Sequence, residues 1–141
     1  GVLNEQEIDA RYEIYYGQFI QTVLTKAKTL LGMVDKGIIP ALCRTLSFYS
    51  ASSIGVEGKS IAINRRISEC QSLIDELDYH NRLLSEGIKK ASEGKNKKDV
   101  GKYMISDIRP LLDIIKDICN QAEHIIPRDF YPFPTIQDLI V

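Results

Sequence analysis

Apolar side chains recur every three or four residues along most of the chain, which is the spacing of one face of an α-helix. The first run begins after Asn4, a favourable N-cap with Glu7 in a capping-box arrangement, and continues to about Val34. About 30 helical residues span about 45 Å, too long for a small globule to surround, so we expect an elongated bundle. The run consists of Ile8, Tyr12, Tyr15, Phe19, Val23, Ala27, Leu30 and Val34.

A second helical pattern covers residues 38–49, after a weak point at residues 35–37. Pro40 lies near its start. It is either in the first turn of a new helix or a kink in a continuous one, and the sequence leaves both open. Residues 50–60 are small and polar, and they predict a loop.

A third pattern runs from about Ser60 to Gly94, with Asn81 on its apolar stripe. Residues 95–98 then predict a tight polar turn, and Asp99 is the candidate N-cap of the next helix.

The fourth pattern starts at Tyr103 or Met104 and ends before Pro127. Pro110 lies inside it and is expected to kink it, because proline removes one backbone hydrogen bond and crowds the preceding turn.

The last 14 residues form a Pro- and aromatic-rich tail. Residues 131–134 must be extended, and Thr135 is expected to cap a short final turn carrying Ile136, Leu139 and Ile140. Aromatic side chains at this density predict that the tail packs on the bundle or on a partner.

These patterns predict an all-α fold, an elongated antiparallel bundle of about four long helices with a Pro/aromatic C-terminal tail. The chain of 141 residues fits one domain over residues 1–141. It begins with Gly1 instead of Met, and we expect it to be a piece of a larger protein.

The net charge and the cysteine content limit the classes of partner and the compartment that we expect for this chain. The net charge is −1, so we expect neither a nucleic-acid nor a membrane partner, and no apolar run approaches the length of a spanning helix. The three cysteines are odd in number and widely spaced, which favours reduced thiols and a cytoplasmic protein.

The candidate chemistry is sparse. Gly55 and the Gly58–Lys59–Ser60 sequence resemble the end of a phosphate-binding loop, but the glycine spacing is wrong and a helix-capping loop is the better interpretation. Glu76 and His80 form an i, i+4 pair that is typical of a solvated helix face.

No Glu-x-x-His pair occurs, so we predict no metal site. Cys43, Cys70 and Cys119 fall on or beside apolar stripes and are predicted to be inert core thiols. The sequence therefore predicts no catalytic residue, no metal ligand and no cofactor in this chain.

An aromatic stripe in the first helix remains, made of Tyr12, Tyr15, Tyr16 and Phe19. It indicates either core packing or a surface that docks on another protein, because tyrosine combines an apolar face with a polar tip.

Three segments resemble a known family. Residues 4–14 (NEQEIDARYEI) resemble the opening of the C-terminal helical region of type III glutamine synthetases, and residues 38–41 (IIPA) resemble a later step of that region. Residues 131–140 (YPFPTIQDLI) resemble its closing segment.

The resemblance implies a parent enzyme of nitrogen metabolism that joins ammonia to glutamate and uses ATP and magnesium. It carries over no catalytic residue to this chain. It implies a structural, oligomer-packing domain whose partners are the catalytic body of the same polypeptide and neighbouring subunits. The docking candidates are Tyr12, Tyr15, Tyr16, Phe19, Tyr131 and Phe133.

Two other interpretations stay open. The chain could be a stand-alone helical interaction or sensor module, which would begin with Met near residue 1, or a metal-dependent bundle enzyme, which would carry a stoichiometric metal.

Overall fold

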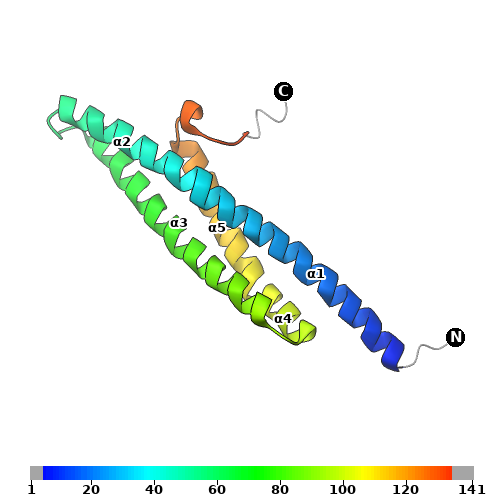
Figure 1. Cartoon of the computed structure of the whole chain (residues 1–141). Helices are drawn as coiled ribbons and strands as arrows, with labels where there is room; N and C mark the ends of the chain where they lie inside the picture. Colours follow the sequence, from blue (N-terminus) through cyan, green and yellow to red (C-terminus); the bar gives the residue numbers. More distant parts are fainter. Residues whose placement is uncertain (1–4, 135–141) are drawn as a thin grey trace.

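A computed structural model describes residues 5–134, apart from the side chain of Asp9, and shows an elongated molecule (Figure 1). Within that range every regular element is helical, which confirms the all-α prediction. The predicted N-cap at Asn4 and the turn after Thr135 lie outside the described residues. The elements are α1 (Glu5–Met33), the π-helical η1 (Val34–Ile38), α2 (Ile39–Gly55), α3 (Ile61–Glu93), α4 (Lys97–Tyr103), the π-helical η2 (Met104–Ile108), α5 (Arg109–Ile125) and the 3₁₀-helical η3 (Arg128–Phe130).

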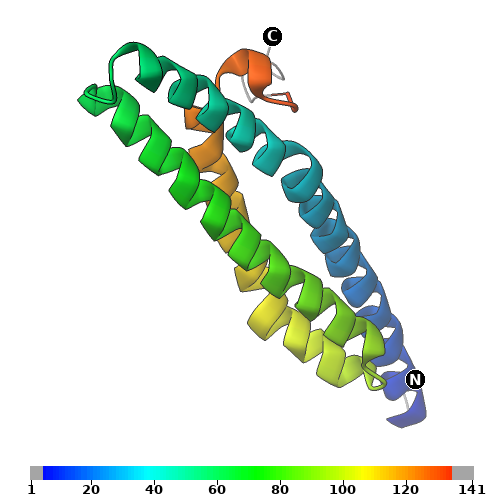
Figure 2. The same cartoon turned by 60° about the vertical axis from the view of Figure 1, so that its left-hand side comes forward.

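These elements join into three long rods instead of the predicted four. The first rod combines α1, η1 and α2 into 51 consecutive helical residues, about 77 Å long. The second rod is α3, and the third combines α4, η2 and α5. α3 runs antiparallel to both other rods (Figure 2). The chain stays helical through the weak point at residues 35–37, so of the two alternatives that the sequence left open for Pro40, the continuous helix is the one observed.

Each π segment directly precedes a helix with proline in its first turn. The N–H of Ile39 donates to the Val34 carbonyl, and the N–H of Arg109 donates to the Met104 carbonyl, five residues back in both cases. Proline lacks an N–H, and its ring crowds the carbonyl four residues earlier. A π turn just before the proline is wider than an α turn, and it therefore increases the separation between the proline ring and that carbonyl. Pro40 and Pro110 therefore lie within continuous rods, and neither one ends a helix.

Both π segments keep their ends in the core. Val34 and Ile38 bracket η1, Met104 and Ile108 bracket η2, and all four side chains are buried. The widened turns therefore carry the apolar stripe past each proline. The core lies between the middle parts of the rods, from Ile20 in α1 to Ile126 after α5, and its fully buried large side chains include Leu42, Leu77, Leu84 and Ile115.

The turns between the rods differ from the predicted ones. α2 extends to Gly55, so the first turn covers only residues 56–60, and Ser60 caps α3 by accepting the Ile63 N–H at 3.3 Å. In the second turn Asn96 is the N-cap, because its Oδ1 accepts the N–H groups of Lys98 and Asp99. The prediction of Asp99 as the cap is wrong, and α4 begins at Lys97, earlier than predicted.

Gly87 provides a test of the packing between α3 and η2. A Cβ at Gly87 would lie 2.5 Å from the Cδ1 of the buried Ile108. Gly87→Ala should therefore lower the free energy of unfolding by about 1 kcal/mol, because overpacking of about 1–3 kcal/mol outweighs a gain of about 1 kcal/mol in helix propensity. Gly32→Ala is the matched control. It meets no atom within 4 Å and should stabilise the chain. Urea unfolding followed by circular dichroism measures both, and equal stability of the two variants would contradict the close contact.

Candidate docking surfaces

The predicted aromatic stripe divides into two outward and two inward rings. Tyr12 and Tyr15 are 58% and 61% exposed, whereas Tyr16 and Phe19 are half-buried. Tyr16 packs on α4 at Gly101, where a Cβ would lie 2.5 Å from the tyrosine Cδ1. Core packing and surface presentation, the two alternatives of the sequence, therefore apply to different members of the stripe.

The outward residues form one face of α1, which we call the N-terminal aromatic surface: Ile8, Tyr12 and Tyr15. These residues are spaced i, i+4 and i+7 and are all exposed. The Tyr15 ring stacks on Phe19 with centroids 6.5 Å apart. The first turns of α1 extend beyond the turn between α3 and α4 (Figures 1 and 2), so this surface faces outward at one end of the molecule.

A cleft of about 830 Å³ adjoins this surface. Tyr12, Glu13 and Tyr16 line it from α1, and residues 95–98 line it from the turn between α3 and α4 and from the start of α4. Three of the residues 95–98 are lysines, so this side of the cleft is positively charged. The sequence showed the lysines as a polar turn, but it could not show that the turn lies against the tyrosines.

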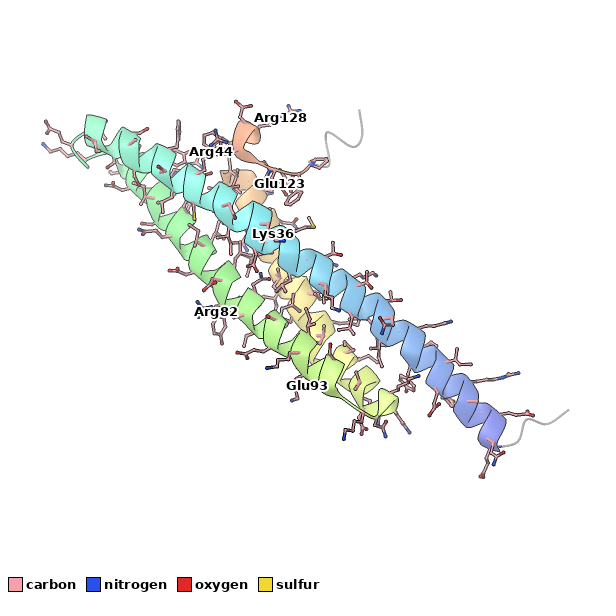
Figure 3. All side chains as sticks on the ribbon, in the orientation of Figure 1. Lys36, Arg44, Arg82, Glu93, Glu123 and Arg128 are labelled. Carbon is pink, nitrogen blue, oxygen red and sulfur yellow. The ribbon has the colours of Figure 1, made fainter. Side chains whose placement is uncertain are left out.

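The described part of the tail packs on its own bundle. Phe130 lies edge-on to Phe48, with the guanidinium of Arg44 4.2 Å from the Phe130 ring centroid. Figure 3 shows Arg44 of α2 beside η3. Phe133 and Tyr131 are half-buried.

Gly37 makes room for the tail. A Cβ there would lie 2.6 Å from Cζ of Phe133 and 3.2 Å from Cγ of Pro132. Tyr131 also packs against the core. These are contacts within the chain, and the docking role of Tyr131 and Phe133 remains a prediction.

A buried polar contact joins α3 to the first π segment. Asn81 is 3% exposed, and its Nδ2 donates to the Leu31 carbonyl at 3.2 Å and to Asp35 Oδ1 at 2.8 Å. Its own Oδ1 has no hydrogen-bond partner. The two hydrogen bonds tie α3 to the first rod, and the unpaired buried oxygen offsets part of their contribution to stability.

The cysteines do not form a reactive centre. Burial raises the pKa of Cys119 to about 11. Burial, followed by the Glu69 charge, raises the pKa of Cys70, although Arg66 opposes the shift. Both thiols therefore stay protonated at neutral pH and are poor nucleophiles. The prediction of a core position is wrong for Cys43, which is exposed on the outer side of α2.

The remaining candidates are local helix contacts. The Nδ1–H of His80 donates to the backbone carbonyl of Glu76 at 2.8 Å, so the predicted pair of side chains is instead a contact to the backbone. Residues 5–134 contain no group of three or more potential metal ligands. Within the same residues, no helix has the length and hydropathy required to cross a bilayer.

The comparisons with known proteins support the resemblance over the start of the chain. Residues 1–52 match the family model described as "Glutamine synthetase C-terminal domain". The match spans most of the first rod, including the aromatic stripe and Pro40, and it confirms the predicted similarity to a glutamine synthetase C-terminal domain. Searches of curated proteins and of solved structures found no significant match.

Asn81→Asp tests the buried contact. The new carboxylate would face the Asp35 carboxylate and the Leu31 carbonyl, so its pKa in the folded chain should rise above the unfolded value of about 3.9. A carboxyl whose pKa is raised in the folded chain lowers stability only at pH values at which that carboxyl is ionised in the unfolded chain. The loss should therefore be small near pH 4 and increase to about 2–4 kcal/mol at pH 7.

Urea unfolding at pH 4 and pH 7 measures the loss. Adding Asp35→Asn to the Asn81→Asp chain restores an amide donor to the pair and should recover part of the stability at pH 7. A loss that is equal at both pH values would contradict the proposed contact.

Proposed function

We propose that this chain is the C-terminal domain of a type III glutamine synthetase and that it packs against the catalytic body and neighbouring subunits. The observation that carries the proposal is the family match over residues 1–52. The matched segment includes the rod end that presents the N-terminal aromatic surface. The family similarity and the most exposed aromatic side chains of α1 therefore coincide in the same part of the chain.

The physical support is the exposure of this rod end. Large apolar side chains that share one exposed helix face are typical of protein interfaces. Tyr12 and Tyr15 each offer a broad apolar ring with a hydroxyl that can stay hydrated or bond to a partner, which suits the centre of an interface. The lysines at residues 95–98 would guide an acidic surface toward the same end of the molecule.

In this proposal the chemistry belongs to the rest of the parent enzyme. ATP and magnesium bind there, and the ligation of ammonia to glutamate takes place there in the cytoplasm. This chain contributes to the rate only by holding subunits in place. Docking through Tyr12 and Tyr15 separates this role from folding, because these rings lie outside the core of the chain.

Replacing the two outward tyrosines tests the proposal. Tyr12→Ala/Tyr15→Ala in the complete synthetase should weaken subunit assembly at least about tenfold, because a buried interface tyrosine contributes about 2 kcal/mol or more. Native mass spectrometry across a dilution series measures the assembly, and glutamine formation at each dilution measures the activity. Thermal unfolding of the 141-residue chain should change little, since both rings are exposed.

Tyr79→Ala is the matched control. Tyr79 is 61% exposed, the same as Tyr15, but it lies on α3. It should leave assembly and activity unchanged. An unaltered oligomer in the double alanine variant would remove the docking role from this surface. Equal weakening by Tyr79→Ala would show that assembly does not depend on this end of the rod.

A further inference from the structure

The start of α1 extends past the rest of the bundle as a helical arm, which comprises residues 5–15 (Figures 1 and 2). Every side chain of this arm that the structure describes is exposed to solvent. Extending a helix into water gains little free energy per residue, so most helical stability in proteins comes from packing of an apolar face. The arm would therefore be stabilised by a partner that covers its N-terminal aromatic surface.

The arm and the turn beside it carry opposite charges. Residues 5–13 contain four carboxylates and one guanidinium, a net charge of −3. Residues 95–98 contain three lysines and no acidic side chain, a net charge of +3. These lysines are exposed, and none of them forms an ion pair with another residue whose side chain the structure describes. Equal and opposite charges therefore lie at the same end of the molecule.

This arrangement is complementary to itself under a two-fold axis. In a two-fold dimer the same surface of each copy meets the other, so a contact between two different parts of that surface occurs twice. If two arms lie antiparallel, the acidic arm of each copy approaches the lysines of the other copy. The apolar faces of the two arms then meet between these two charged contacts.

One alignment of the two arms satisfies the apolar and the charged contacts together. If Ile8 of one arm lies opposite Tyr15 of the other, Glu5 lies opposite Gln18. Lys97 is at this level of the rod, because its Nζ lies 3.6 Å from the position that a Cβ would take at Gly17. The cleft of about 830 Å³ between the lysines and α1 leaves room there for the start of a second arm.

We propose that the arm docks on the same end of a second copy of this chain, as an antiparallel pair in which the acidic arm of each copy contacts residues 95–98 of the other. The proposal rests on the proposed function, because it names the partner of the surface to which that function assigns docking. Ile8, Tyr12 and Tyr15 supply the apolar centre of the pair. The charges select the antiparallel alignment and speed the encounter.

Charge reversal followed by mixing tests the pair. Glu5→Lys/Glu7→Lys gives a basic-arm variant, and Lys95→Glu/Lys98→Glu gives an acidic-turn variant. Each variant alone should dimerise at least about tenfold more weakly than the native chain, because both charged contacts of the dimer become repulsive. An equal mixture should form a heterodimer with an affinity within about threefold of the native dimer, because both contacts become attractive again.

Sedimentation velocity across a concentration series measures the association. The pair buries a smaller interface than the standard of about 1,600 Å², so the native dimer should form in the micromolar range and weaken as salt is added. The matched controls are Glu57→Lys/Asp75→Lys and Lys59→Glu/Arg65→Glu, which make the same changes in net charge at exposed positions of α3 and of the turn before it. Both controls should dimerise like the native chain, and circular dichroism should show equal helix content in all variants.

Three outcomes would overturn the proposal. The native chain could stay monomeric at millimolar concentration, or the two reversed variants could dimerise as well as the native chain. The mixture could also fail to restore the dimer. If Tyr12→Ala/Tyr15→Ala still weakens the complete synthetase in that last case, the surface docks on the catalytic body. The pairing of arms would then be wrong, and the docking role under the proposed function would stand.

Discussion

The long rods of this molecule depend on how the backbone passes two prolines without ending a helix. Proline removes a hydrogen-bond donor and crowds the turn before it, and in a straight α-helix this combination costs about 3 kcal/mol or more. Here a π turn precedes each one, closed by Ile39 on Val34 and by Arg109 on Met104. Because both ends of each π turn are buried, the core stripe continues on the same side of the rod.

The straight rod α3 is adapted to both π turns. It presents Asn81 to the first, where the amide bonds to Asp35, and Gly87 to the second, where the absence of a side chain admits Ile108. Asn81 supplies a hydrogen-bond donor, and Gly87 leaves room for the Ile108 side chain. A shift of α3 by one turn would bury Asn81 without its partners and would press a side chain onto Ile108. Both contacts are therefore compatible only with the observed alignment of α3 with the other two rods.

Periodicity was sufficient to predict the helical class and most of the core, because apolar spacing does not depend on tertiary contacts. It could not identify the π turns. The sequence left Pro40 undecided, and a one-residue widening changes hydrogen bonds without interrupting the apolar stripe. The cap at Asn96 was missed for a related reason, since Asp99 is an equally good capping residue and only the geometry of the turn selects between them. Cys43 was misplaced because it directly follows Leu42 of the apolar stripe, but adjacent residues of a helix point in different directions, so Leu42 is buried and Cys43 is exposed.

The sequence predicted that the four aromatic residues of α1 share a helical spacing, but it could not predict which of them are exposed. All four aromatic residues of α1 share helical spacing, yet Tyr16 points inward because the turn after α3 brings Gly101 against it. That contact also determines which face remains exposed. α4 covers Tyr16 on one side of the rod, whereas Tyr12 and Tyr15 stay exposed to solvent. The packing that stabilises this end of the molecule is therefore also what makes its aromatic rings available to a partner.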